Sequence, residues 1–328
     1  MKEEKLVKFF TMACPTICFA LLVSTACLFF ASGIDTSILQ VNAKHRFGAT
    51  YMTMNNSYYV LLDEQIRTLI EANGDQLISR DASMDQEKQL EQIEELINDG
   101  VEVIFLTPVD WEAVRPGLEL ANAAGVPVIV VDTPVKDEEL VSCSVLSDNY
   151  RAGVLCGEHL LSIRDSANIL LLEHYTAESG EERIRGFLDT LKGHEGFRVL
   201  GQGESDGQIE NALPVMEELL EEYPEADTLM ALNDPSAFGG MAAIRGAGLT
   251  DRFLVYGVDG TPEAKGMVKD GMMTATCAQY PSIVSERTVE QGYRFLEEGL
   301  GTYGEEVICP VELITAENVD QFSINGWQ

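Results

Sequence analysis

The sequence predicts an α/β protein built from two doubly wound lobes, each with a parallel sheet covered by helices. Three observations lead to this fold class. Short apolar runs typical of strands alternate with amphipathic segments of helical length, which is the pattern of βαβ units. The runs at 103–106 and 128–131 are apolar throughout, as expected for parallel strands buried on both faces. The 328 residues exceed one usual domain, so we divide about ten expected strands between two lobes.

Residues 1–34 are expected to form a signal or membrane-anchor segment. No charged residue occurs from Phe9 to Ile34, and the stretch is preceded by Lys2, Lys5 and Lys8. An apolar stretch of about 20 residues can span a membrane, and lysines before it favour an N-terminus inside the cell. We therefore expect the rest of the chain to be extracytoplasmic, either anchored on the outer face of the cytoplasmic membrane or secreted or periplasmic after cleavage.

Three fates of this segment are compatible with the sequence. It is retained as an anchor, it is cleaved after the small residues at 31–33, or Cys27 carries a lipid. The lipid alternative has the least support, because Ser24 stands where a branched aliphatic residue usually precedes such a cysteine and the run stays apolar after Cys27. Residues 35–46 are short and polar, so we expect a tether there.

The elements of the folded part can be placed in order along the chain. The first strand is expected at 47–53, with a helix to about 73 and a short strand at 76–80. Ser83 and Gln86 stand at capping-box spacing, and Gly100 ends the helix that they begin. Later strands are expected at 102–106, 126–131, 168–173, 197–201, 228–232, 254–258 and 273–278. Later helices are expected at 112–124, 149–164, 180–192, 211–222, 235–247 and 282–299.

Charge and cysteine content restrict the expected partners and sites. The chain has 22 basic and 54 acidic residues and a formal net charge of −32, which repels phosphate backbones, so we expect no nucleic acid partner. The seven cysteines show no CxxC or Cys/His spacing, so we expect no metal site. Those beyond the N-terminal segment are expected to be buried small hydrophobes, although a disulfide that includes Cys143 stays open.

Motifs of common enzymes are missing from the sequence. There is no GxSxG elbow and no Walker sequence, and the glycine-rich stretch at 201–207 has the wrong spacing for a dinucleotide fingerprint, so we expect a surface turn there. The four histidines lack metal-ligand spacing and are predicted to be surface or helix-flank residues: His45, His159, His174 and His194. We therefore expect no catalytic residue and no cofactor. A nucleotide-dependent α/β enzyme stays the less favoured alternative.

Polar and aromatic residues gather where the predicted strands end. In an open α/β sheet, ligands bind beyond the carboxyl ends of the strands, so these side chains should face one space. Carboxylates and amides suit closely spaced hydroxyls, an arginine suits paired oxygens, and flat aromatic rings suit the C–H faces of a sugar. The candidate ligand-binding residues are Asn56, Tyr58, Tyr59, Asp132, Arg183, Asn233, Asp259 and Gln279. Taken singly, a strand-end Asp or Asn is often a helix cap, and Tyr59 could be a core aromatic.

Several of these segments, in this order, resemble type I periplasmic sugar-binding proteins, in particular the ribose-binding-like branch. They lie at 54–59, 131–133, 147–149, 183–187, 232–234, 257–262 and 278–281, and the stretch at 315–319 resembles the carboxy-terminal ending of that family. The resemblance covers residues 46–320.

The resemblance implies two α/β lobes joined by three crossing segments, with a ligand enclosed between them. Lobe 1 would comprise 47–147 and 281–307, and lobe 2 would comprise 148–280 and 308–328. Gln279 would lie at the hinge. The implied function is an extracytoplasmic solute-binding protein that captures a sugar or polyol for the membrane permease of an ABC importer. The alternative is a membrane-anchored sugar-sensing domain that reports to a kinase or chemoreceptor.

Two departures from the ribose-binding pattern concern the ligand. Thr133 stands where ribose binders typically have an arginine after the aspartate, and the segment at 205–207 lacks the aromatic residue that those proteins place nearby. Loss of one charged hydrogen bond changes affinity about 10- to 150-fold. These differences predict a sugar-like ligand other than ribose.

Overall fold

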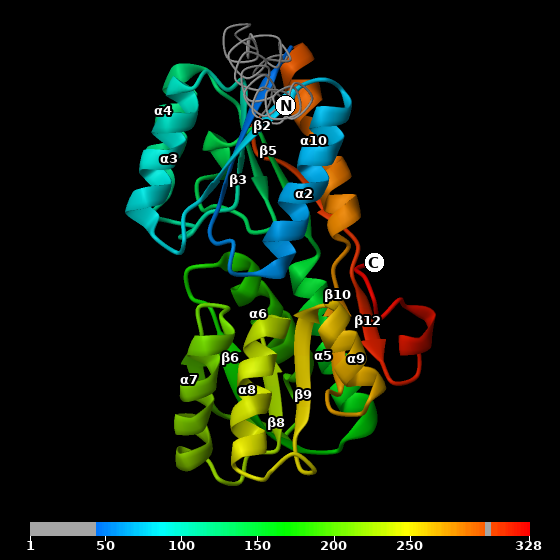
Figure 1. The fold of residues 1–328 in the computed structure, drawn as a ribbon. Helices are drawn as coiled ribbons and strands as arrows, with labels where there is room; N and C mark the ends of the chain where they lie inside the picture. The colour runs from blue at the N-terminus through cyan, green and yellow to red at the C-terminus, as the bar shows by residue number, and fades with distance from the viewer. Residues whose placement is uncertain (1–43, 299–302) are drawn as a thin grey trace, which may run out of the picture. The chain divides into compact units, whose positions relative to one another are not determined.

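The computed structural model describes residues 44–298 and 303–328, in which strands and helices alternate along the chain (Figure 1). Its strands form two six-stranded sheets within one unit of the chain, Lys44–Gln328. The predicted fold class is confirmed. We call the part built on the first sheet lobe 1 and the part built on the second sheet lobe 2. The predicted signal or anchor segment at 1–34 lies outside the described residues.

Lobe 1 has a parallel sheet with helices on both faces. In spatial order its strands are β11 (Glu305–Cys309), β5 (Cys143–Ser147), β4 (Val128–Val131), β3 (Val103–Leu106), β1 (Arg46–Tyr51) and β2 (Gln76–Asp81). One face is covered by α2 (Ser57–Ala72) and α10 (Pro281–Glu298), whose apolar residues share a core with β1. The other face is covered by α3 (Gln86–Asn98) and α4 (Arg115–Ala124). The strand order reverses at β1, which makes the carboxyl ends of β1 and β3 the usual place for a ligand.

Lobe 2 repeats this arrangement. Its strands are, in spatial order, β12 (Glu312–Thr315), β10 (Ala275–Ala278), β9 (Leu254–Asp259), β8 (Thr228–Ala231), β6 (Ala167–Glu173) and β7 (Phe197–Glu204). All pairs are parallel except β10 with β12. One core contains side chains of α7 (Ile209–Glu222), α8 (Asp234–Gly246) and α9 (Pro262–Lys269), and the opposite core contains those of α5 (Asn149–Ile163) and α6 (Glu178–Leu191). Here the order reverses at β6.

Close packing of α5 on α6 sets the position of Arg183. A Cβ on Gly153 of α5 would lie 1.8 Å from the backbone oxygen of Arg183, and one on Gly186 would lie 2.1 Å from that of Tyr150. Both contacts are far too short for a side chain, so glycine at these positions allows the two helix backbones to approach. This close approach places Arg183 at the end of β8, where Nη1 donates to the backbone oxygen of Leu232.

The chain passes between the two sheets at three places: from β5 to α5, from β10 to α10, and from β11 to β12. The predicted lobe boundaries remain predictions, but one of them needs adjustment. Strand β11 extends to Cys309 and pairs with β5 over its whole length. A boundary at 307 would therefore divide a strand of the first sheet.

The predicted start of α3 is wrong. Its N-cap is Asp85, whose carboxylate accepts a hydrogen bond from the N–H of Lys88 at 3.0 Å. Ser83 cannot cap the helix because it has a left-handed backbone (φ 56°) and its N–H donates to the Asp81 carboxylate. Of the two residues at capping-box spacing, Gln86 begins the helix, but Ser83 belongs to the preceding turn.

Some elements were not predicted from the sequence. They are β5, β11, β12 and the short helix α9. β5 and β12 are each five residues or fewer and contain polar residues, so they lack the continuous apolar run that identified the central strands.

The cysteines and the helices of the described part bear on two further expectations. Cys143, Cys156, Cys277 and Cys309 are all buried and free, which confirms the core interpretation and rules out the disulfide considered for Cys143 among these residues. Within residues 44–298 and 303–328, no helix has both the length and the apolar character needed to cross a membrane.

Candidate ligand-binding site

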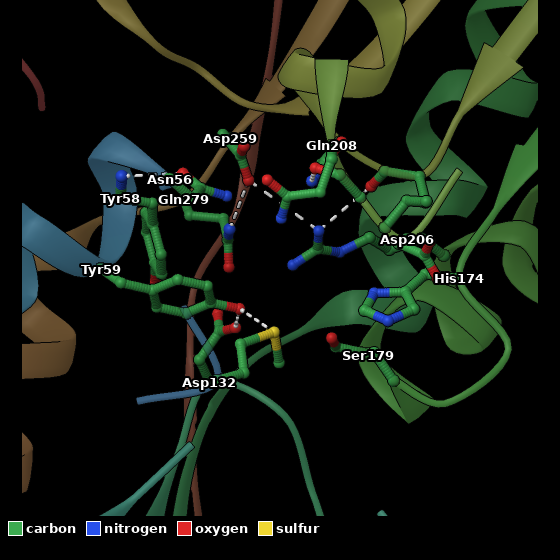
Figure 2. A pocket seen from close by; sticks show the side chains of 16 residues that line it. Asn56, Tyr58, Tyr59, Asp132, His174, Ser179, Asp206, Gln208, Asp259 and Gln279 are labelled. Carbon is green, nitrogen blue, oxygen red and sulfur yellow. Dashed lines mark hydrogen bonds and ion pairs between the residues drawn. The ribbon is translucent and has the colours of Figure 1, made fainter. Parts of the chain in front are cut away.

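The carboxyl ends of strands from both sheets face one cavity between the lobes (Figure 2). The space left in it is about 20 Å³, room for about one water molecule, so a larger ligand requires the lobes to move apart. Its lining residues are Met52, Asn56, Tyr58, Tyr59, Asp132, His174, Ala177, Ser179, Arg183, Asp206, Gly207, Gln208, Leu232, Asn233, Asp259 and Gln279. Every one of the candidate residues named from the sequence is among them. Their contact with a ligand stays a prediction.

The start of α2 places the aromatic part of the lobe 1 wall. Asn56 caps the helix, because its side-chain oxygen accepts a hydrogen bond from the N–H of Tyr58 at 2.9 Å. Tyr58 and Tyr59 follow in the first turn, with ring centroids 5.7 Å apart in an edge-to-face arrangement. The helix cap and the aromatic surface of the cavity are thus made by one local motif.

Asp132 lies directly after β4 and is buried. Its backbone is left-handed (φ 76°), which turns the chain at the end of the strand. The hydroxyl of Tyr59 donates a hydrogen bond to Oδ2 at 3.0 Å, whereas Oδ1 has no partner in the described chain. Burial raises the pKa of this carboxyl, and the positive charge of Arg183 opposes the rise.

Arg183 enters the cavity from the second turn of α6. Its Nε donates to Oδ1 of Asn149 at 2.9 Å, and Nη1 donates to the backbone oxygen of Leu232 at 3.1 Å. Nη1 also lies 3.8 Å from Oδ1 of Asp259, with both side chains almost fully buried. The guanidinium is therefore held by fixed acceptors before any ligand binds.

Asp259 is the last residue of β9, and Gln279 follows β10 where the chain crosses to lobe 1. Nε2 of Gln279 donates to Oδ1 of Asp259 at 2.8 Å, and Oδ2 of Asp259 and Oε1 of Gln279 have no partner among residues that the structure describes. Burial, and then the nearby charge of Asp234, raises the pKa of Asp259 well above its usual value, and Arg183 opposes the rise. Two buried oxygens of residues that line the cavity therefore lack a hydrogen-bond partner in the described chain.

Asn233 is both a helix cap and a cavity residue. Its Oδ1 accepts from the N–H of Ser236 at 2.9 Å, and its Nδ2 donates to the backbone oxygen of Gly207 at 3.0 Å. The capping alternative that the sequence left open is thus correct for Asn56 and Asn233, and both still line the cavity.

The prediction for His174 is wrong. It was expected to be a surface or helix-flank residue, but its side chain lines the cavity and only 3% of the residue is exposed. Burial lowers its pKa to about 4, so the ring is neutral near pH 7. His174 directly follows β6, so the strand-end pattern that selected the other residues would also have selected it.

The surface turn predicted at 201–207 is also wrong for most of that range. Strand β7 extends to Glu204, Ser205 is completely buried, and the following residues Asp206, Gly207 and Gln208 line the cavity. Because the strand was predicted to end at 201, its polar end was not recognised. Met52, Ala177, Ser179 and Leu232 were missed as well, and no residue pattern distinguishes them.

Hydrogen bonds between the lobes close the cavity. Nδ2 of Asn55 in lobe 1 donates to Gln208 at 3.0 Å and to Glu210 at 2.8 Å in lobe 2. The N–H of Ser179 donates to Oγ1 of Thr133 at 3.1 Å. Thr133, which stands where ribose binders typically carry an arginine, therefore contacts the opposite lobe with its hydroxyl.

One cluster has metal-ligating residue types. Ligand atoms of His174, Glu204 and Asp206 lie within 4.8 Å of one another. The two oxygens of Glu204, however, accept hydrogen bonds from the N–H groups of Tyr175 and Asp206, both at 2.8 Å. This carboxylate stabilises the turns around it, and we assign no metal to the cluster.

Two α/β lobes that close over a small, polar, aromatic-walled cavity define a binding protein for small molecules. Residues 47–300 match the family model described as periplasmic binding protein domain, and the chain belongs to this family.

Known proteins that are similar to this chain support its assignment to this family. The ribose import binding protein of Escherichia coli is 30% identical over 257 residues, which cover 78% of this chain and 86% of that protein. The xylitol-binding protein of Mycolicibacterium smegmatis is 27% identical over 282 residues, covering 84% and 78%. A solved ABC transporter solute-binding protein from Mycobacterium smegmatis with bound glycerol has a TM-score of 0.79 and 27% identity, covering 85% of this chain and 96% of that one.

Proposed function

We propose that this chain is an extracytoplasmic solute-binding protein that captures a sugar or polyol between its lobes and delivers it to the permease of an ABC importer. The family and the roles of its relatives, which are import and solute-binding proteins, support this proposal. They also support a binding function over catalysis. The eight residues selected from the sequence are proposed as ligand contacts.

The observation that carries the proposal is a set of buried polar atoms without partners around the cavity. They are the hydroxyl of Tyr58, Oδ1 of Asp132, Oδ2 of Asp259 and Oε1 of Gln279, each unpaired within the described part of the chain. A buried polar group without a hydrogen bond costs about 1–3 kcal/mol. A ligand with several hydroxyls would satisfy these acceptors, and its C–H groups would contact the tyrosine rings.

The charges of the cavity favour a ligand that donates hydrogen bonds. Asp132, Asp206 and Asp259 line it together with one arginine, Arg183. Phosphate or carboxylate ligands would meet three carboxyl groups and a single arginine, whereas each hydroxyl of a sugar can donate to a carboxyl oxygen and accept from the guanidinium. A neutral polyhydroxylated ligand therefore fits these groups best.

The contacts of Thr133 and Gly207 support a ligand other than ribose. The hydroxyl of Thr133 is already engaged by the opposite lobe and offers no positive charge. The segment at 205–207 lacks the aromatic residue that ribose binders place nearby, and a Cβ on Gly207 would come 3.0 Å from Nδ2 of Asn233. The wall on this side is therefore built from His174 and polar groups in place of an aromatic ring.

Thermal unfolding in the presence of candidate ligands tests the proposal. The purified chain is heated with D-ribose, D-allose, xylitol or myo-inositol, and any ligand that raises the midpoint is then titrated by calorimetry. A ligand at 100 times its dissociation constant adds about 2.7 kcal/mol to stability, an easily measured shift. We expect at least one polyol other than ribose to bind most tightly. Absence of a shift with all pentoses, hexoses and polyols tried would contradict the proposal.

Import and sensing are separated by a second measurement. Residues 1–34 would anchor a sensor, and they lie outside the described structure. Ligand uptake that depends on this chain, in vesicles that contain an ABC permease and its ATPase, would support import. A binding protein that stimulates a neighbouring kinase but no uptake would support the sensing alternative.

A further inference from the structure

Residues 326–328 lie against the junction of the two lobes, where the end of the described chain returns to the start of α10 (Figure 1). The ring of Trp327 is 5.7 Å from that of Tyr58 and packs against the core shared by α2 and α10. Trp327 does not itself line the cavity. It packs against Tyr58, which does line the cavity.

Gln328 contacts the other two cavity residues at this junction. Its Nε2 donates to the backbone oxygen of Asp259 at 3.1 Å and also to that of Gln279. These are the residues whose side chains are joined by a hydrogen bond and whose remaining oxygens are unpaired. One amide group therefore links the backbones of two proposed ligand contacts.

The local backbone is shaped for this approach. Gly260 follows Asp259 with a left-handed backbone (φ 71°), and a Cβ there would lie 2.8 Å from Nε2 of Gln328. A side chain at residue 260 would push the amide away from both carbonyl groups. The absence of a side chain at Gly260 leaves the space that Gln328 occupies.

Lys265 of α9 anchors the same segment to lobe 2. It is completely buried, and its ammonium donates to the backbone oxygen of Gly326 at 2.7 Å and to Oε1 of Gln328 at 2.9 Å. A buried ammonium needs such acceptors, because burying a charge without partners is strongly unfavourable. Residues 326–328 are thus fixed to lobe 2 through Lys265 and to lobe 1 through Tyr58.

We infer that Trp327 and Gln328 are positioning residues of the ligand site, which set the places of Tyr58, Asp259 and Gln279 without touching the ligand. This inference rests on the proposed function. It assigns a role in recognition to a segment beyond 320, the end of the region that resembles sugar-binding proteins.

Substitutions in the full chain test the inference. Gln328→Glu retains an oxygen for Lys265 but replaces the donor that faces the backbone oxygens of residues 259 and 279. Trp327→Ala removes the support behind Tyr58. Ile324→Ala is the matched control, because Ile324 is exposed and belongs to the same segment. Affinity for the polyol that best stabilises the unaltered chain among D-ribose, D-allose, xylitol and myo-inositol is measured by calorimetry, and urea unfolding without ligand is measured in parallel.

We expect Gln328→Glu and Trp327→Ala to raise the dissociation constant about 10-fold, the size of one hydrogen bond or packing contact, and Ile324→Ala to leave it unchanged. Unchanged affinity in both variants, with only lower stability, would overturn the inference while the proposed function stands. Failure of the unaltered chain to bind any of the polyols would overturn both.

Fluorescence of Trp327 gives a readout that a purely structural contact would not move. The chain has two tryptophans, so in Trp111→Phe the emission comes from Trp327 alone. We expect the emission to change with ligand concentration at the dissociation constant measured by calorimetry, because Tyr58 lies between Trp327 and the ligand. A constant emission through full saturation would contradict the coupling between Trp327 and the site.

Discussion

The two walls of the cavity differ in how their polar atoms are used. In lobe 2, Arg183 and Asn233 are held by hydrogen bonds to neighbouring backbone and side-chain atoms. In lobe 1, the hydroxyl of Tyr58 and Oδ1 of Asp132 have no partner in the described chain. The lobe 2 wall is therefore largely pre-organised by its own contacts, whereas the lobe 1 wall offers an aromatic surface and unused hydrogen-bonding capacity.

This difference predicts that the two walls contribute to binding in different ways. Pre-organised groups lose little conformational entropy when a ligand arrives, so they contribute to affinity through fixed geometry. Unpaired buried groups destabilise the closed cavity until a ligand satisfies them, so they favour closure in the presence of ligand. Substitutions in lobe 2 should consequently affect stability as well as affinity, and substitutions in lobe 1 should affect mainly affinity.

Asp259 and Gln279 are the exceptions in lobe 2, because Oδ2 and Oε1 are unpaired, and Asp259 should give the largest effect. Asp259→Asn keeps the shape and the acceptor for Gln279 but removes the charge. We expect about a 100-fold loss of affinity, since a charge-assisted hydrogen bond is worth about 1.5–3 kcal/mol, with unfolding free energy within about 1 kcal/mol of the parent.

Calorimetry and urea unfolding measure the two quantities. Asp251→Asn, an exposed substitution in the same lobe, should change neither. If Asp259→Asn kept full affinity, Asp259 would not be a ligand contact and the assignment of the lobe 2 wall would fail.

The pH dependence of the unfolding free energy tests the burial of His174 in the lobe 2 wall. Burial lowers its pKa to about 4, and the charges of Asp206 and Asp110 act in the opposite direction. Because the unfolded chain takes up the proton first, the stabilising effect of the neutral ring is complete above about pH 6.5 and is lost as pH falls toward 4. Between pH 7 and about 4.5 we expect the parent to lose about 2–3 kcal/mol more unfolding free energy than His174→Gln.

Urea unfolding at the two pH values gives this difference. The carboxyls near His174 whose pKa values are raised, such as Glu173 and Glu204, are present in both proteins and cancel in the comparison. His194→Gln, at an exposed position, is the control. Equal pH dependence of the parent and His174→Gln would show that His174 is not buried as described.

A substitution at Tyr58 tests the lobe 1 wall, where buried polar atoms lack partners. Tyr58→Phe removes a hydroxyl that has no partner in the described chain but keeps the ring. We expect about a 10-fold loss of affinity and no loss of stability, because one ligand hydrogen bond disappears and no internal one does. Tyr256→Phe is the matched control, since its buried hydroxyl lies 3.0 Å from Nδ1 of His159. It should lose about 1 kcal/mol of stability and bind normally. The reverse pattern would contradict the difference between the walls.

Asn55 should give the smallest effect, because it joins the walls at an exposed edge. Asn55→Ala removes the hydrogen bonds to Gln208 and Glu210 and should speed ligand release about 2- to 5-fold, with little change in association. Stopped-flow measurement of Trp emission follows both rates. Asn98→Ala, at an exposed position in α3, should leave release unchanged. A slower association with unaltered release would show that Asn55 does not act on the closed form.

The strand-end pattern identified the lobe 1 wall almost completely and the lobe 2 wall only in part. Strands that the sequence located to within a few residues precede Asn56, Tyr58, Tyr59 and Asp132. His174 was overlooked because the histidines were judged by metal-ligand spacing and not by their place after a strand. The residues after β7 were overlooked because this edge strand is half-exposed and contains two glycines, so its end could not be located.

The alternation of apolar runs and helical segments in the sequence determined the two-lobe α/β fold. It also determined half of the residues around the cavity, because these directly follow recognisable strands. The tertiary structure decided which of those side chains keep free hydrogen-bonding atoms, that Asn56 and Asn233 also cap helices, and that residues 326–328 return to support Tyr58, Asp259 and Gln279. These contacts join residues far apart in the chain, as from Tyr58 to Trp327. Sequence spacing carries no information about distances of that kind, because only packing of the complete fold brings such residues together.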